Sequence, residues 1–217
     1  NSTYEHSIDV SIYAVMIGIG MGMRNGLLKE LAVSALLHDI GKLQIPTKLL
    51  HKPGKLTPEE YEEMKKHSEY GYELLKDNVM MTSKIKMGVY MHHENVDGTG
   101  YPLGLEGDQI YLFAKIIHIA DVYDATTANR AFRTGICAFL VLVHMDPQTE
   151  LSEPGALYKF IERTVEAYIN TEVKLSNGDV GRVVLLNKNF LSRPIVISDT
   201  KTYDLSKDFH LHIDALL

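Results

Sequence analysis

The sequence predicts a mainly α-helical protein, a helical bundle that is followed by a small C-terminal antiparallel β appendage. Two observations support this fold class. Apolar residues recur at helical spacing through most of the first 168 residues, and short β-branched runs replace that pattern near Thr171. We therefore predict a helical domain over residues 1–168 and a β appendage over residues 169–217. A chain of 217 residues is long enough to form one well-filled core.

The helices can be placed from their apolar faces, caps and glycine or proline breaks. Thr57 and Glu60 form a capping box at the start of one helix, and the proline- and glycine-containing residues 43–55 before it are expected to be a loop. An apolar run near the N-terminus is too short for a bilayer and holds several glycines, so we expect a buried helix and no membrane insertion. The predicted helices cover residues 10–23, 27–38, 57–75, 84–93, 112–129 and 155–168.

The β appendage is predicted from one turn signal and the runs around it. Asn177-Gly178 lies between two β-branched runs, residues 173–175 and 181–185, which is the pattern of a β-hairpin. Residues 194–197 are expected to add a third strand, and residues 209–213 a fourth.

Composition limits the partners. Hydrophobic residues make up 45% of the chain and charged residues 23%, as in an ordinary soluble globular protein. The formal net charge of −6 argues against a nucleic-acid polymer as partner, so any phosphate-bearing substrate must be held by local lysines, arginines or metal ions. Cys137 is the only cysteine, which excludes an internal disulfide and makes a cytoplasmic location the expectation. We interpret Cys137 itself as an inert core residue.

Histidine and aspartate recur where the predicted helices should be buried. Taken alone, His38 or His67 would more often be a satisfied core residue than a ligand, and neighbours such as His92 and His93 point about 100° apart on a helix. Buried carboxylates are harder to explain without a partner, because burying an unpaired charge is costly. A metal ion would compensate both kinds of group. The residues in question are His6, His38, Asp39, His67, His92, His93 and Asp121, with Asp124 as a further member of the site or a cap.

Imidazole and carboxylate together suit Fe, Mn, Zn or Ni, and an aspartate can bridge two ions. Paired metal ions promote phosphoryl transfer by generating a nucleophile and clamping the attacking and leaving oxygens. The residues therefore favour a helical dinuclear metallohydrolase over a coincidentally histidine-rich core.

Three motifs resemble those of the HD-GYP phosphodiesterases, a branch of the HD metallohydrolases. His38-Asp39-Ile40-Gly41-Lys42 is similar to the HD motif of that family. The run 92–102, His-His-Glu followed by Asp-Gly-Thr-Gly-Tyr-Pro, resembles its HHE…DGxGYP signature. Residues 119–125 resemble a third block, and residues 130–133 the segment after it. The match runs from His6 to about Arg133. It implies an HD-type helical bundle.

The resemblance implies two divalent transition-metal ions, Fe or Mn, with Ni or Zn as alternatives. One ion would be held by His6, His38, Asp39 and Asp121. Asp39 would also bridge to the second ion, which His67, His92 and His93 would complete. The implied reaction is hydrolysis of cyclic di-GMP to pGpG, or onward to GMP, by a metal-bridging hydroxide.

The resemblance also implies roles around the metals. Lys42 would lie against the scissile phosphate and assist the leaving oxygen, Tyr101 would contact the substrate, and Arg130 and Arg133 would grip phosphate or guanine.

Two departures from the family pattern matter. Trinuclear members carry a glutamate where this chain has Ser2, so we expect two metals and pGpG as the end product. Glu5 is on the wrong side of the helix to replace that glutamate. The usual RPYR segment reads Arg130-Ala131-Phe132-Arg133 here, which would loosen the substrate loop without affecting the metals.

Other interpretations stay open. The chain could be a non-catalytic sensor that binds a cyclic dinucleotide or a protein partner, or an HD hydrolase of another cyclic nucleotide. A homodimer, or fusion to an upstream sensor domain, is compatible with each. The remaining histidines match no ligand position and are interpreted as structural or solvated: His51, His118, His144, His210 and His212.

Overall fold

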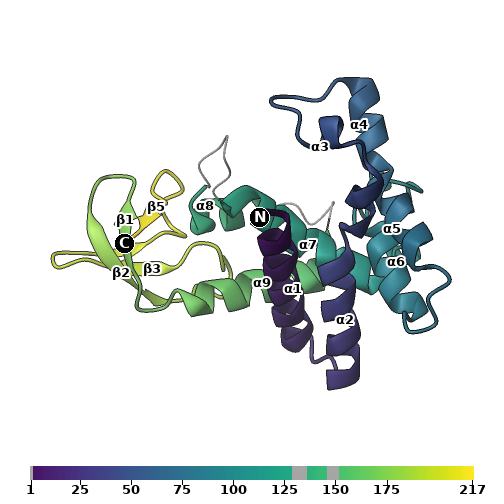
Figure 1. The fold of residues 1–217 in the computed structure, drawn as a ribbon. Helices are drawn as coiled ribbons and strands as arrows, with labels where there is room; N and C mark the ends of the chain where they lie inside the picture. The colour runs from purple at the N-terminus through teal and green to yellow at the C-terminus, as the bar shows by residue number, and fades with distance from the viewer. Residues whose placement is uncertain (1, 129–135, 146–151) are drawn as a thin grey trace.

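The computed structural model describes residues 2–128, 136–145 and 152–217. The helices lie at the centre and one end of the molecule, and the sheet lies at the other end, with α9 running between them (Figure 1). The predicted fold class, mainly helical with a small C-terminal antiparallel sheet, is confirmed. The helical elements are α1 (Ser2–Gly20), α2 (Asn25–Leu37), η1 (Ile40–Gln44), α3 (Thr47–Leu50), α4 (Pro58–Lys65), α5 (His67–Leu75), α6 (Ser83–Met91), η2 (Gly107–Gln109), α7 (Leu112–Thr127), α8 (Ala138–Met145) and α9 (Pro154–Ala167).

The core is built around α7, which is apolar on most of its surface and is packed against α1, α6 and α9. Buried side chains of α1, such as Val10 and Ile17, meet Ile116 and Ile119 of α7 in one apolar cluster. Because α7 is enclosed on several sides, a polar residue on it must face a partner or a site. None of the described helices has the length and hydropathy that crossing a bilayer requires.

The helix predicted over residues 57–75 is two helices. Its start is as expected, because Thr57 accepts a hydrogen bond from the Glu60 backbone N–H and the Glu60 side chain accepts one from the Thr57 N–H. The chain leaves α4 at Lys66, and α5 begins at His67. The apolar stripe continues across this break, so periodicity alone could not reveal it.

The loop predicted over residues 43–55 contains structure. The end of η1 and the one-turn helix α3 lie within it. Pro46 precedes α3, where proline is tolerated because the first backbone N–H groups of a helix have no intrahelical partner. The loop prediction was therefore wrong for residues 43–44 and 47–50.

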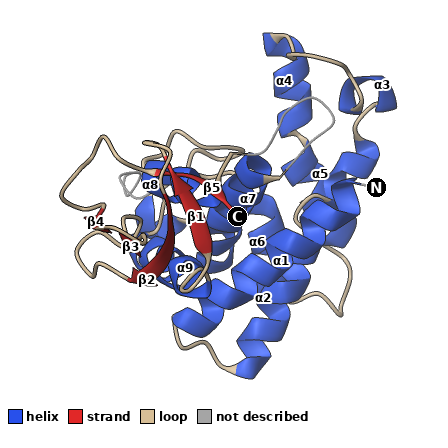
Figure 2. Ribbon diagram, turned by 90° about the vertical axis from the view of Figure 1, so that its left-hand side faces the viewer, coloured by secondary structure: helices blue, strands red, loops and turns tan. Residues whose placement is uncertain are grey.

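The C-terminal sheet has five strands in the order β4-β3-β2-β1-β5, and all its pairs are antiparallel (Figure 2). The predicted hairpin and third strand are confirmed, whereas the predicted fourth strand was misplaced and the strand at Thr202 was missed. The strands are β1 (Glu172–Leu175), β2 (Val180–Leu185), β3 (Ile195–Ile197), β4 (Thr202–Asp204) and β5 (Ile213–Leu216).

One face of the sheet extends the helical core. Val173, Val183 and Val196 are fully buried in the same apolar cluster as Phe139 of α8 and Phe160 of α9. The division at residue 168, between α9 and β1, stays a prediction.

Candidate metal centre

The structure brings together the side chains of all seven predicted ligands. Three groups of ligand atoms each lie within 4.8 Å of one another: His6–His38–Asp121, His67–His92–His93 and His38–Asp39–His92. The side chains come from α1, the end of α2, the start of α5, the end of α6 and the middle of α7. Segments far apart in the sequence therefore meet at one buried point. Their role as ligands stays a prediction.

Backbone carbonyls at helix ends orient three of the clustered histidines. His38 and His92 are the C-caps of α2 and α6, and each donates its Nδ1–H to the carbonyl three residues earlier, at 2.7 Å. His67 donates its Nδ1–H to the Met64 carbonyl at 2.8 Å. A carbonyl only accepts, so each of these rings has a proton on Nδ1 and directs its Nε2 into the cluster.

The break after α6 resolves the geometry of the paired histidines. Because α6 ends at Met91, His92 and His93 are not held 100° apart by regular helix. Their Nε2 atoms lie 3.3 Å and 3.1 Å from Nε2 of His67.

This arrangement fits a metal ion. The bare Nε2 atoms of His67 and His92 face each other, and neither can donate without giving up its carbonyl bond. Nε2 of His38 is buried without a hydrogen-bond partner among the described residues. Unpaired buried acceptors are costly, and a cation bound among them satisfies all of these atoms.

Asp39 faces both halves of the cluster. Its Oδ1 lies 3.5 Å from Nε2 of His67, and its Oδ2 lies 3.5 Å from Nε2 of His38 and 3.7 Å from that of His6. Nζ of Lys42 donates to Oδ2 at 2.5 Å. Burial alone would raise the pKa of Asp39, but the surrounding imidazoles and the Lys42 ammonium hold it well below its usual range.

Gly41 places Asp39 against α5. A Cβ atom at this position would lie 1.8 Å from the His67 carbonyl oxygen and 2.4 Å from the Gly71 nitrogen. Only glycine allows such a close approach of two backbones, which accounts for the glycine two residues after Asp39.

The group around His6 and the group of His67, His92 and His93 differ in the protonation of their histidines. Burial lowers the pKa of His6, but hydrogen bonds from its ring to Asp121 and Asp124 raise it to about 9. Nδ1 of His6 lies 2.6 Å from Asp124 Oδ2, and Nε2 lies 3.1 Å from Asp121 Oδ1. In contrast, burial lowers the pKa of His67 and of His92, and lowers that of His93 to about 3. These rings are neutral, the form in which imidazole binds metal.

The glycine-rich loop after α6 carries Tyr101 to the cluster. The Tyr101 ring stacks on His93, with ring centroids 4.6 Å apart and planes inclined by 26°. Burial raises the pKa of its hydroxyl, which stays protonated at neutral pH. The loop is held by Glu94, whose buried carboxylate accepts the backbone N–H groups of Leu103 at 2.6 Å and Leu105 at 2.9 Å.

Two residues that act on the site were not assigned to it from the sequence. The sequence leaves open whether Asp124 is a site member or a cap, and in the structure it orients His6. From the sequence, Glu94 is only part of a motif. The sequence signal for Asp124 was its position one turn after Asp121 on an apolar helix. Arg130 and Arg133, the predicted substrate-binding arginines, lie outside the described residues, as does the segment between them.

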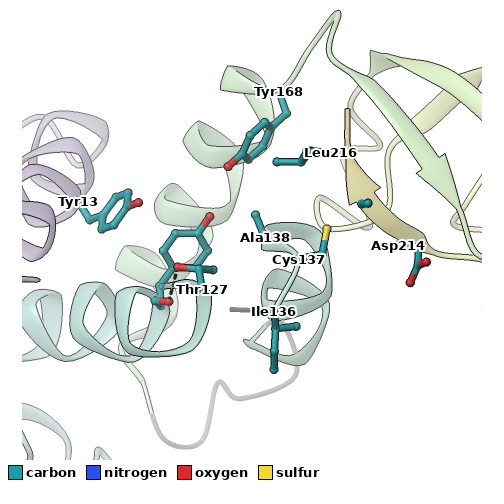
Figure 3. A pocket seen from close by; sticks show the side chains of 10 residues that line it. Tyr13, Thr127, Ile136, Cys137, Ala138, Tyr168, Asp214 and Leu216 are labelled. Carbon is teal, nitrogen blue, oxygen red and sulfur yellow. Dashed lines mark hydrogen bonds between the residues drawn. The ribbon is translucent and has the colours of Figure 1, made fainter. Parts of the chain in front are cut away.

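A separate cavity of about 400 Å³ lies where α1, α7 and α9 meet α8 and β5. Tyr13, Cys137, Tyr168 and Leu216 are among the residues that line it (Figure 3). Cys137 is partly exposed here rather than fully buried, so its interpretation as a core residue holds only in part. None of the seven clustered side chains lines this cavity, so the candidate site is assigned from ligand chemistry and not from cavity volume.

The fold and the cluster define a class of protein, an α-helical protein with a His/Asp cluster able to bind metal ions. The family model described as HD domain matches residues 2–148, and the chain belongs to this family. The names of its relatives agree with the HD-GYP resemblance, because several are cyclic di-GMP phosphodiesterases.

A cyclic di-GMP phosphodiesterase of Pseudomonas aeruginosa is 32% identical over 194 residues, which cover 89% of this chain and 47% of the relative. A 3′3′-cGAMP-specific phosphodiesterase of Vibrio cholerae is 40% identical over 131 residues, covering 60% of this chain and 30% of the relative. The chain thus spans about half or less of the length of these relatives.

A solved structure with a similar fold is an HDG"Y"P protein from Bdellovibrio bacteriovorus. It superposes with a TM-score of 0.60 at 21% identity and covers 73% of this chain and 51% of that one. At this identity the likeness concerns the fold.

Proposed function

We propose that this chain is a metal-dependent phosphodiesterase that hydrolyses cyclic di-GMP to pGpG. One observation carries the proposal: two groups of candidate ligands, His6–His38–Asp121 and His67–His92–His93, have members near different oxygens of a single buried carboxylate, Asp39. Relatives that are named cyclic di-GMP phosphodiesterases support the choice of substrate.

The ligand assignment follows from the two oxygens of Asp39. Oδ2 faces His6 and His38, so these residues and Asp121 would hold one ion with it. Oδ1 faces His67, so this residue with His92 and His93 would hold the second. Two divalent ions, Fe or Mn, would supply a nucleophile at neutral pH and neutralise charge on the phosphate.

The chain's own residues position the substrate and move the proton. Lys42 lies at the edge of the cluster with its side chain 29% exposed. Its Nζ, now on Asp39, can turn to a phosphate oxygen and donate a proton to the leaving ribose oxygen. Tyr101 keeps its hydroxyl proton and can donate a hydrogen bond to the substrate. Arg130 and Arg133 would grip phosphate or guanine.

The expected product is the linear dinucleotide. The glutamate that trinuclear relatives use is replaced by Ser2, and Glu5, one turn before Asp9, is exposed and belongs to none of the clustered groups. Two ions would therefore serve one cleavage, and pGpG would accumulate rather than GMP.

A second candidate substrate is favoured by a specific observation. Relatives of Vibrio cholerae that are 37–40% identical are named 3′3′-cGAMP-specific phosphodiesterases. A mixed guanine–adenine cyclic dinucleotide would present the same phosphates to the metals. The sensor alternative would require binding without turnover.

The test is turnover by Mn- or Fe-loaded protein, with products separated by chromatography. We expect pGpG from cyclic di-GMP and none from Asp39→Ala, because that change removes the shared carboxylate. His51→Ala is a matched control, because His51 also bonds a helix carbonyl through Nδ1 but is exposed. If fully metal-loaded wild type binds cyclic di-GMP but forms no product, the enzyme proposal is wrong and the sensor interpretation takes its place. If 3′3′-cGAMP is hydrolysed faster than cyclic di-GMP, the mixed dinucleotide is the preferred substrate.

A further inference from the structure

A small aromatic and cationic surface lies outside the candidate metal centre, beyond Tyr101. Nζ of Lys65 lies 5.5 Å from the centroid of the Tyr101 ring and 4.9 Å from that of Tyr61. Tyr61 is 48% exposed, and the Lys65 side chain is 28% exposed. These three residues, which we call the outer subsite, lead outward from His93, on which Tyr101 stacks.

Lys65 is fixed relative to the cluster because it shares a turn with His67. The Lys65 carbonyl accepts a hydrogen bond from the buried Ser68 hydroxyl at 3.1 Å, and the adjacent Met64 carbonyl accepts from the His67 ring. The break between α4 and α5 therefore sets the direction of His67 and the place of Lys65 together.

The ammonium of Lys65 is available to a ligand. Its Nζ pairs with Glu62 Oε1 at 2.7 Å, on a side chain that is 67% exposed. Exposed ion pairs of this kind contribute little, so a ligand that offers better acceptors can displace Glu62. Tyr61 adds a half-exposed ring on which a flat group can stack, and such stacking is tolerant of base identity.

We propose that the outer subsite binds a purine base of the substrate and that Lys65 makes it selective for guanine. This inference rests on the proposed phosphodiesterase function. With a phosphate at the cluster, one base of a cyclic dinucleotide is directed past Tyr101 towards Tyr61 and Lys65. Guanine presents O6 and N7, both acceptors, to a cation. Adenine places an amino donor at the O6 position, which opposes the ammonium and leaves it only N7.

Steady-state kinetics on metal-loaded protein test the inference, with cyclic di-GMP and cyclic di-AMP as the two probes. Lys65→Met keeps an unbranched chain over the rings and removes the ammonium. We expect the KM for cyclic di-GMP to rise about tenfold with kcat nearly unchanged, and the preference over cyclic di-AMP to fall by a similar factor. Lys65→Arg should restore most of the preference. Tyr61→Leu should raise the KM for both dinucleotides alike.

Lys66→Met is the matched control, because Lys66 is the next residue, is more exposed and pairs with Glu63. It should leave both KM values unchanged. Unchanged kinetics in Lys65→Met would overturn the subsite, and an equal rise in KM for both dinucleotides would overturn guanine selection and make Lys65 a phosphate contact.

The result is separable from the proposed function. If wild type binds cyclic di-GMP without turnover, the dissociation constants of the same variants for the two dinucleotides are measured in place of KM. The outcomes that support or overturn the subsite are then the same as for KM. Wild type that neither binds nor hydrolyses either dinucleotide overturns both proposals.

Discussion

The two ligand groups on either side of Asp39 are built from different chemistry. The group of His6, His38 and Asp121 includes a carboxylate and a histidine whose pKa is raised to about 9 by Asp121 and Asp124. The group of His67, His92 and His93 consists of imidazoles whose pKa values are lowered by burial. An ion that enters the first group must displace a proton from His6, whereas the second group already presents bare nitrogens. If each group holds an ion as proposed, the two sites differ in the protonation of their histidines before metal binds.

The largest effect should come from removing one ligand of either group. We expect His92→Asn to lose the ion of the three-histidine group and His38→Asn to lose the other, each with a fall in turnover of at least about a thousandfold, because paired ions act together. Metal content per chain and product formation are the measurements. His144→Asn, on an exposed histidine that also bonds a helix carbonyl, should change neither. If His92→Asn kept its full metal content, the assignment of this group would be wrong.

A smaller effect, confined to metal binding by the group of His6, His38 and Asp121, is expected from a change at Asp124. Asp124→Asn should weaken metal binding by the first group roughly 10- to 100-fold, since it orients His6 without itself being a ligand. Metal titration should show the three-histidine group unchanged. Asp108→Asn, on a fully exposed carboxylate, serves as the control. Equal weakening of both groups would mean that Asp124 supports the bundle rather than His6.

The smallest effect should come from the loop that carries Tyr101. Glu94→Gln replaces one of two carboxylate acceptors by an amide donor, which then opposes a backbone N–H. We expect kcat/KM to fall about tenfold and the free energy of unfolding to fall by roughly 1–3 kcal/mol. Metal content should stay at the wild-type level, which separates this variant from the ligand changes. Glu69→Gln, on the exposed face of α5, is its control. Loss of metal from Glu94→Gln would contradict a role confined to the loop.

Much of the site could be predicted because its residues break a pattern. An aspartate at position 121 within an apolar helix, or at 39 beside a histidine, stands out against leucine, isoleucine and alanine. The role of Glu94 could not be predicted, and that of Asp124 only in part, because both depend on which atoms face each other after the chain folds. The position of Asp124 indicates the site, but its contact with His6, like those of Glu94 with Leu103 and Leu105, is known only from the structure.

The fold was predictable to the same degree. The long helices after α1 and the hairpin at Asn177-Gly178 were placed within a few residues, whereas α1 begins at Ser2, well before the predicted start at residue 10. Short elements were not: β4 has three residues and α3 has four, too few for a period to be read. The break at Lys66 escaped prediction because the apolar spacing of the sequence continues across it, although only α5 has buried residues.

That break has an electrostatic consequence. The helices α2, α4 and α6 all end at the cluster, since His38 and His92 cap two of them and His67 bonds the last turn of the third. The aligned peptide dipoles of a helix place roughly half a negative elementary charge at its C-terminus. At the break, the positive N-terminal end of α5 offsets the end of α4, so it is the ends of α2 and α6 that bring a negative potential to the cluster before any carboxylate is counted. The backbone of the bundle thus favours a positively charged occupant, whatever side chains complete its coordination.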